Sequence, residues 1–215
     1  MRPVICLITD GRLAAGCDGA ALVERVRSAA RAGVHLIQLR ERGLDDRELA
    51  ALARECVTAV RGTRARIVVN DRVDVARAAG AHGVHLKGDS FPATRAREIA
   101  EPGFLIGRSV HSVAEVEQAS EDGAVDYLMF GTVFASESKP GLEPAGLTIL
   151  AEAARASRVA LLAVGGITLE NAAQVARAGA DGFAAIGLFS GCPAGSLADI
   201  VQRVTSVFDT LQTGS

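Results

Sequence analysis

The chain has 215 residues, of which 49% are hydrophobic, and this suits one domain, 1–215, with a large core. Its formal net charge is −2, without a run of like charges, which argues against a nucleic-acid partner. No stretch approaches the ~20 apolar residues of a membrane span, and the N-terminal apolar stretch is too short for a signal peptide. These two observations predict a protein without membrane contact. The four cysteines have no paired spacing, so we predict neither disulfides nor a zinc site, and a cytoplasmic location.

Short apolar stretches alternate with amphipathic ones along the whole chain. Strands are predicted at 3–9, 34–40, 66–70, 82–86, 104–109, 125–130, 158–164 and 181–187, with helices such as 19–32, 45–61, 112–122 and 168–178 between them. Eight such units predict a (β/α)8 TIM barrel. The alternative is a doubly wound open sheet, but no Gly-x-Gly-x-x-Gly follows the first strand. In a barrel, the chemistry lies at the carboxyl ends of the strands.

The second strand ends on polar side chains. Gln38 and Arg40 share a face with Val34 and Leu36, and we expect this face to point into the barrel. A guanidinium at that depth is costly unless an anion meets it. The anion is either a ligand or an internal partner such as Glu41.

Polar residues also follow the third and fourth strands. Asn70 and Asp71 either cap the next helix, or Asp71 holds a divalent metal, most naturally Mg²⁺ bridged to phosphate oxygens. His85 is placed inward near the end of its strand, where the alternative is a satisfied core histidine. On the fifth strand Ser109 is free to bind a ligand.

The helix after the fifth strand carries a start signal. Ser112 is predicted to be its N-cap, with Glu115 at the capping-box position, and His111 is expected to be structural or to face solvent.

A long loop follows the sixth strand. Long loops in compact domains are usually functional, and hydroxyls with a lysine suit a diphosphate. The alternative is a surface loop without function. The side chains concerned are Thr132, Ser136, Ser138 and Lys139.

The last two strands each end on glycine. Gly165-Gly166 precedes Thr168, a predicted N-cap, and the next strand ends on Ile186-Gly187. Two strand–glycine turns side by side aim backbone N–H groups at one point, which predicts a phosphate site at strands 7 and 8. The alternative is that the glycines only permit tight turns.

With these pieces in place, the chain resembles the thiamin phosphate synthase / thiazole tautomerase superfamily over nearly its full length. The resemblance implies a (β/α)8 barrel, a cytoplasmic location and small phosphate-bearing substrates. The motifs that carry it are Ile37-Gln38-Leu39-Arg40-Glu41-Arg42, Val69-Asn70-Asp71-Arg72, Gly83-Val84-His85-Leu86, Gly107-Arg108-Ser109-Val110-His111-Ser112, Ser136-Glu137-Ser138-Lys139 and Val164-Gly165-Gly166-Ile167.

The synthase branch joins an aminopyrimidine methyl diphosphate to a thiazole ethyl phosphate and releases diphosphate with Mg²⁺. The resemblance implies that Gln38, Asn70-Asp71 and His85 contact the pyrimidine and the metal. It implies that Gly166 and the backbone near Ile186-Gly187 take the thiazole phosphate. The implied diphosphate contacts are Arg40, Arg42, Asn70, Ser109 and Lys139, where Arg42 replaces a usual lysine.

The sequence also departs from both branches. The synthase's Gly-Gln-x-Asp reads Lys87-Gly88-Asp89-Ser90, so its second metal carboxylate falls on Ser90 and Asp89 becomes the nearest substitute. Cys6 stands where the synthase usually has Tyr. The tautomerase's catalytic histidine is Thr132, whose hydroxyl cannot shuttle protons as imidazole does.

We therefore predict a thiamin phosphate synthase in which Arg40, Arg42, Lys139 and His85 are catalytic and Mg²⁺ binds Asp71 and Asp89. Two alternatives stay open: a tautomerase in which His85 moves the proton, and an inactive thiazole phosphate binder. We predict a homodimer as the assembly.

Overall fold

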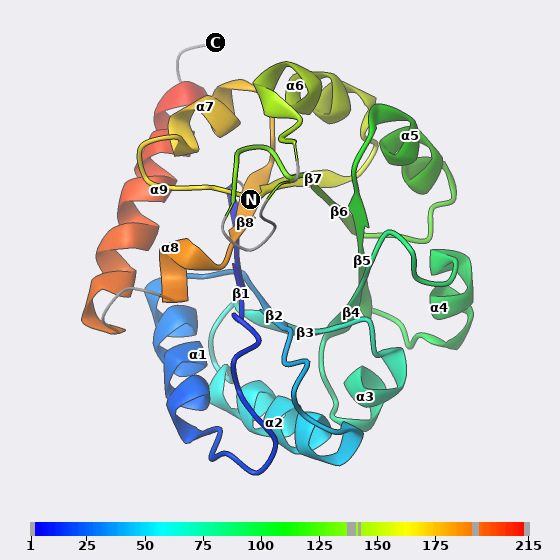
Figure 1. Cartoon of the computed structure of the whole chain (residues 1–215), viewed down its shortest axis with the longest axis vertical. Helices are drawn as coiled ribbons and strands as arrows, with labels where there is room; N and C mark the ends of the chain where they lie inside the picture. The colour runs from blue at the N-terminus through cyan, green and yellow to red at the C-terminus, as the bar shows by residue number, and fades with distance from the viewer. Residues whose placement is uncertain (1–2, 137–140, 142, 191–193, 213–215) are drawn as a thin grey trace.

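Eight parallel strands pair in chain order and close into a barrel, with β8 pairing back onto β1 and the helices forming a ring outside (Figure 1). The computed structural model describes residues 3–136, 141, 143–190 and 194–212. The strands are β1 (Val4–Ile8), β2 (Leu36–Leu39), β3 (Arg66–Asn70), β4 (Gly83–Leu86), β5 (Leu105–Val110), β6 (Tyr127–Phe130), β7 (Ala160–Val164) and β8 (Gly182–Ala185). The helices are α1 (Ala20–Ala32), α2 (Asp46–Ala59), α3 (Val73–Ala78), α4 (Ala93–Ile99), α5 (Val113–Glu121), α6 (Gly146–Ala156), α7 (Ala172–Arg177), α8 (Gly187–Ser190) and α9 (Leu197–Gln212), with a 3-10 turn, η1, at Ala194–Ser196.

The (β/α)8 prediction is confirmed, and each predicted strand is present with ends shifted by a few residues. The helices predicted at 19–32, 45–61 and 112–122 are α1, α2 and α5. Ser112 caps α5 by accepting the Glu115 N–H, but the Glu115 carboxylate accepts the N–H of His111 rather than that of Ser112. The predicted N-cap is therefore confirmed, whereas the reciprocal bond of the capping box is absent among the bonds of Glu115.

The helix predicted at 168–178 is shorter than expected, because α7 begins at Ala172. Thr168 is not its N-cap. Its backbone N–H donates to Asn171 Oδ1 at 2.8 Å, and Asn171 Nδ2 donates to the Gly166 carbonyl at 2.8 Å. An asparagine side chain therefore holds the glycine turn that follows β7.

Alternation along the strands creates two apolar layers. Side chains that point inward, including Leu36, Val68, Met129 and Leu162, fill the barrel, while those that point outward pack against the helices. The expectation that Val34 lies inside is wrong: it precedes β2 and packs in the outer layer. Leu36 and Gln38 do lie on the inward face, as predicted.

Strand register places polar residues of neighbouring strands at one level of the barrel. Asn70 is opposite His85, and His85 is opposite Gly107. These residues lie near the carboxyl ends of their strands, where the loops leave the barrel. No helix in the described part of the chain has the length and apolar character needed to cross a membrane. One domain over 1–215 stays a prediction.

Candidate active site

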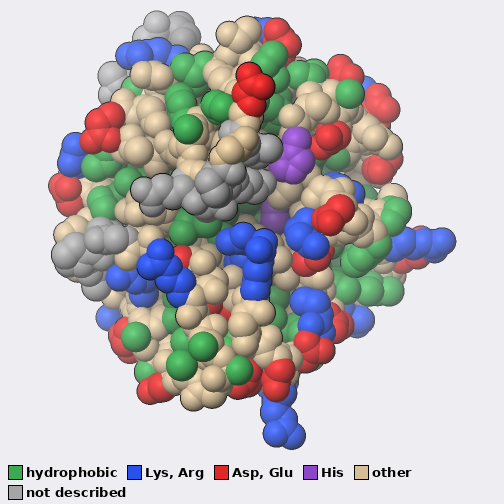
Figure 2. Space-filling view, viewed as in Figure 1, with side chains coloured by type: hydrophobic (Ala, Val, Ile, Leu, Met, Phe, Trp, Pro, Cys, Tyr) green, Lys and Arg blue, Asp and Glu red, His purple; other side chains and the backbone are tan. Residues whose placement is uncertain are grey.

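The carboxyl ends of the strands surround a cavity of about 440 Å³. Along the barrel axis, Lys and Arg side chains gather beside histidines near the centre of this face (Figure 2). Among the described residues, Ser136 is not part of the cavity wall, whereas Asp71, Gly166 and Gly187 each follow a lining residue along the chain. Ser138 and Lys139 lie outside the described residues. The predicted residues that line the cavity are Gln38, Arg40, Arg42, Asn70, His85, Asp89, Ser109, Thr132, Gly165 and Ile186.

Gln38 and Asn70 form an amide pair in the cavity wall. Gln38 Nε2 donates to Asn70 Oδ1 at 2.9 Å, so Asn70 does not cap α3. Gln38 is only 3% exposed, and its Oε1 has no hydrogen-bond partner among the described residues. A buried acceptor without a partner costs about 1–3 kcal/mol. Gln38 lines the cavity, so its Oε1 is an acceptor in the cavity wall that the described residues leave unused.

Three polar side chains form a chain of hydrogen bonds through the barrel interior. Tyr127 Oη lies 3.1 Å from His85 Nδ1, and His85 Nε2 lies 2.9 Å from Ser109 Oγ. His85 is 2% exposed, and burial lowers its pKa to about 3, so the ring is neutral at neutral pH. Burial likewise raises the pKa of the Tyr127 hydroxyl. The neutral imidazole orients the Ser109 hydroxyl at the cavity wall.

Two arginines supply positive charge at the mouth of the cavity. Arg40 is partly buried, and this burial, followed by the nearby Arg42, lowers its pKa. Neither arginine forms an ion pair within the part of the chain that the structure describes. The alternative of an internal pair with Glu41 is wrong, because that carboxylate is buried and accepts the Leu13 N–H at 3.0 Å. The guanidinium groups are available to an anionic ligand.

The loop after β6 packs closely against the glycine turn after β7. Gly165 and Gly166 have φ of +100° and +62°, a region that favours glycine. A Cβ at Gly166 would lie 2.4 Å from the Ala135 carbonyl oxygen, so both conformation and space require glycine here. Thr132 is buried against Gly165, and the Val133 N–H donates to the Val164 carbonyl at 2.9 Å.

The predicted metal carboxylates lie on either side of a lysine. Lys87 Nζ is 2.9 Å from Asp71 Oδ2 and 3.5 Å from Asp89 Oδ1. Asp71 Oδ1 accepts the Ser90 hydroxyl, and the Asp71 N–H donates to the His85 carbonyl at 2.8 Å. Asp71 has φ of +60°, uncommon for a residue with a side chain, and Arg72 rather than Asp71 precedes α3. The capping alternative for Asp71 is therefore wrong.

Sequence reasoning missed part of this wall. Lys87, His111 and Met129 also line the cavity, and Tyr127 lies behind His85. The available signal for Tyr127 was its spacing of two from Met129 on the sixth strand, together with its being the single tyrosine of the chain.

Comparison with known proteins identifies the family of this chain. The family described as "Thiamine monophosphate synthase" matches residues 5–189. The thiamine-phosphate synthase of Roseiflexus castenholzii is 42% identical over 193 residues, covering 89% of this chain and 83% of the relative. That of Chlorobium luteolum is 37% identical over 213 residues, covering 99% and 96%. A solved thiamine phosphate pyrophosphorylase from Pyrococcus furiosus superposes with a TM-score of 0.80 at 31% identity, covering 96% of each chain. This chain therefore belongs to the thiamine monophosphate synthase family.

Proposed function

We propose that this cavity joins an aminopyrimidine methyl diphosphate to a thiazole ethyl phosphate, forming thiamin phosphate and releasing diphosphate. The family and the named relatives support this transferase activity. The observation that carries it in the site is the unpaired Gln38 Oε1 beside two arginines without ion pairs in the described chain. An acceptor of this kind suits the amino group of the pyrimidine, and the guanidinium groups suit the diphosphate attached to it.

The reaction requires a stabilised leaving group. The bond between the pyrimidine methylene and the diphosphate oxygen breaks, and both electrons leave with the diphosphate. The thiazole nitrogen then donates its lone pair to the methylene carbon, which completes a C–N bond without any proton transfer. Arg40 and Arg42 stabilise the negative charge that develops on the leaving oxygen. The partial burial of Arg40 strengthens this interaction because fewer waters screen it.

His85 acts as a neutral hydrogen-bonding group. With a pKa of about 3 it holds Ser109 in place, and the Ser109 hydroxyl donates to a diphosphate oxygen. The tautomerase alternative requires a group that exchanges protons near neutral pH; the pKa of His85 is too low for this role, and Thr132 offers only a hydroxyl. It gains no support from the named relatives, which are synthases.

The turn after β7 and the end of β8 form the site for the thiazole phosphate in this proposal. Gly165 and Ile186 line the cavity, and Gly165 and Gly166 have positive φ, a conformation in which backbone N–H groups often form an anion site. Thr132 lines this end of the cavity and Gly187 follows Ile186 along the chain. Ser136, Ser138 and Lys139 stay proposed contacts to phosphate on the sequence alone, because Ser136 is not part of the cavity wall and the other two lie outside the described residues.

The resemblance implies Mg²⁺, and the arrangement of the side chains does not fit it. Both oxygens of Asp71 are already engaged, one by Lys87 and the other by Ser90. The Asp89 side chain is 82% exposed, and its partner is the same ammonium. No group of three His, Cys, Asp or Glu side chains in the described residues is placed to hold a metal. The contacts of Asp71 and Asp89 thus fit the Lys87 ammonium rather than Mg²⁺.

The substrates of this proposal are small phosphate compounds, as expected for the family. A cytoplasmic location is proposed on the resemblance and on the unpaired spacing of the cysteines, and a homodimer is proposed as the assembly. An inactive thiazole phosphate binder remains the alternative if the protein binds substrate without turnover.

The test of the proposal uses Gln38→Leu, a variant of similar size without the amide. Its KM for the aminopyrimidine diphosphate is expected to rise about tenfold or more, because the amino group loses its acceptor. Its KM for the thiazole phosphate is expected to stay unchanged. An unchanged KM for the pyrimidine, or equal changes for both substrates, contradicts the assignment.

A further inference from the structure

A lysine side chain stands between the two carboxylates that the sequence predicts as metal ligands. Lys87 is one of two lysines in the chain and directly follows β4. Its Nζ contacts Asp71 Oδ2 at 2.9 Å and Asp89 Oδ1 at 3.5 Å, and its side chain is 44% exposed. Lys87 and Asp89 both line the 440 Å³ cavity. The ammonium is therefore held at the cavity wall while part of it faces the space for the ligand.

The inner side of the loop that carries Lys87 is fixed by Ser90. The Lys87 backbone N–H donates to Ser90 Oγ at 2.8 Å, and the Ser90 hydroxyl donates to Asp71. Ser90 and Lys87 thus occupy the two oxygens of the same carboxylate. A carboxylate bound in this way has little room to accept a divalent ion as well.

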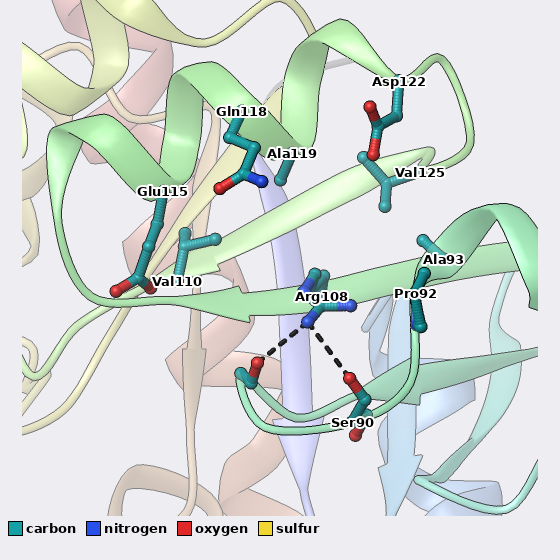
Figure 3. A pocket seen from close by; sticks show the side chains of 11 residues that line it. Ser90, Pro92, Ala93, Arg108, Val110, Glu115, Gln118, Ala119, Asp122 and Val125 are labelled. Carbon is teal, nitrogen blue, oxygen red and sulfur yellow. Dashed lines mark hydrogen bonds between the residues drawn. The ribbon is translucent and has the colours of Figure 1, made fainter.

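Arg108 fixes the outer side of this loop. It lies in a cavity of about 240 Å³ between α4 and α5, and Figure 3 shows its guanidinium group directed at the loop backbone. Its Nη2 donates to the carbonyls of Gly88 at 2.8 Å and Ser90 at 3.3 Å, and its Nη1 donates to that of Phe91 at 3.1 Å. Held from both sides, the loop keeps Lys87 in a defined position.

The Lys87 ammonium offsets one of the two negative charges of Asp71 and Asp89. A lysine side chain carries its positive charge at neutral pH. A divalent ion between Asp71 and Asp89 would lie within a few ångströms of this ammonium, and the repulsion between them opposes binding.

We propose that the Lys87 ammonium is the resident cation of this position: it excludes divalent metal from Asp71 and Asp89 and itself binds the oxygens of the departing diphosphate. The exclusion of metal follows from the contacts of Lys87. The role toward diphosphate rests on the proposed function. Lys87 replaces a metal as a point charge with three donors, which suits a phosphate oxygen.

The first test measures Mn²⁺ binding to the protein alone, from the electron paramagnetic resonance signal of free Mn²⁺. Lys87→Met keeps the aliphatic stem and removes the charge, and the partly exposed side chain makes misfolding a minor concern. We expect Lys87→Met to bind Mn²⁺ about tenfold or more tightly than the wild type, because repulsion is removed. Adding Asp71→Asn should abolish the gain. A wild type that binds one Mn²⁺ as tightly as Lys87→Met overturns the proposal.

The second test measures turnover in EDTA. The wild type is expected to keep most of its rate, whereas Lys87→Met is expected to lose about tenfold or more and to recover it when excess Mg²⁺ is added. Loss of wild-type turnover in EDTA, restored by Mg²⁺, overturns the role toward diphosphate. If the wild type forms no product under any condition, the proposed function fails, while the Mn²⁺ measurement still decides whether Lys87 excludes metal.

Discussion

Gly107 on β5 leaves the space that the ring of Tyr127 on β6 fills. The two residues are opposite each other in the sheet, and a Cβ at Gly107 would lie 2.0 Å from Tyr127 Cζ. Because of this glycine, the phenol crosses the barrel interior and reaches His85. The pair therefore positions the hydrogen-bond chain that ends at Ser109 in the cavity wall.

Replacing Tyr127 by Phe keeps the ring and removes the hydroxyl that His85 Nδ1 contacts. We expect kcat to fall by about threefold to tenfold with little change in KM for the thiazole phosphate, because the imidazole loses the partner that fixes its tautomer. The ¹⁵N chemical shifts of His85 should report a change of tautomer population. If kcat and the shifts are both unchanged, Tyr127 serves packing alone.

His85 makes stability depend on pH. Its pKa is about 3 in the folded chain, against about 6.5 when unfolded, so between these values the unfolded state binds more protons. The free energy of unfolding should therefore fall as the pH falls from 6.5 toward 3, by about 1.4 kcal/mol per unit from this residue. His85→Gln should remove that slope, as measured by urea unfolding between pH 4.5 and 7.5. Parallel curves for the two proteins contradict a buried neutral His85.

Arg40 is predicted to act on the leaving group. Arg40→Gln should lower kcat by about 100-fold while stability changes little, because the guanidinium makes no ion pair within the described chain. Arg40→Lys should recover only part of the rate, since it keeps the charge and loses the fork of donors. The matched control is Arg61→Gln, an exposed arginine that follows α2. Equal rates for Arg40→Gln and Arg61→Gln rule out a catalytic role for Arg40.

Alanine variants of Gly166 and Gly62, compared with each other, test whether the turn after β7 binds phosphate. Both have positive φ, +62° and +78°, but a Cβ at Gly62 meets open space, whereas one at Gly166 lies 2.4 Å from the Ala135 carbonyl oxygen. Gly62→Ala is expected to lose about 1 kcal/mol of stability from backbone strain, and Gly166→Ala is expected to lose more because of the added clash. Gly166→Ala should in addition raise the KM for the thiazole phosphate about tenfold, because the turn must shift. A KM equal to that of Gly62→Ala would remove this turn from the phosphate site.

The barrel and the direction of Gln38 and Arg40 could be predicted from the sequence because both follow from local periodicity. Apolar runs of strand length define the eight units, and alternation from Leu36 sets which side chains enter the barrel. Thr168 misled the prediction because Thr and Asn are both good caps, and the side chain that holds the turn belongs to Asn171.

Contacts between distant segments could not be predicted. Tyr127 and His85 lie 42 residues apart on strands that do not neighbour each other, so their meeting depends on how the barrel closes. The position of Lys87 depends on a loop that Ser90 and Arg108 hold from two sides. Such conformations are determined by tertiary packing rather than by local pattern.

The most direct test of the account is a ³¹P NMR time course with the purified protein, the aminopyrimidine methyl diphosphate and the thiazole ethyl phosphate. We predict that signals of thiamin phosphate and inorganic diphosphate grow in equal amounts, and only when both substrates are present. If folded protein broadens the substrate signals, which shows binding, yet releases no diphosphate, the chain is a binder and its assignment as a synthase is contradicted.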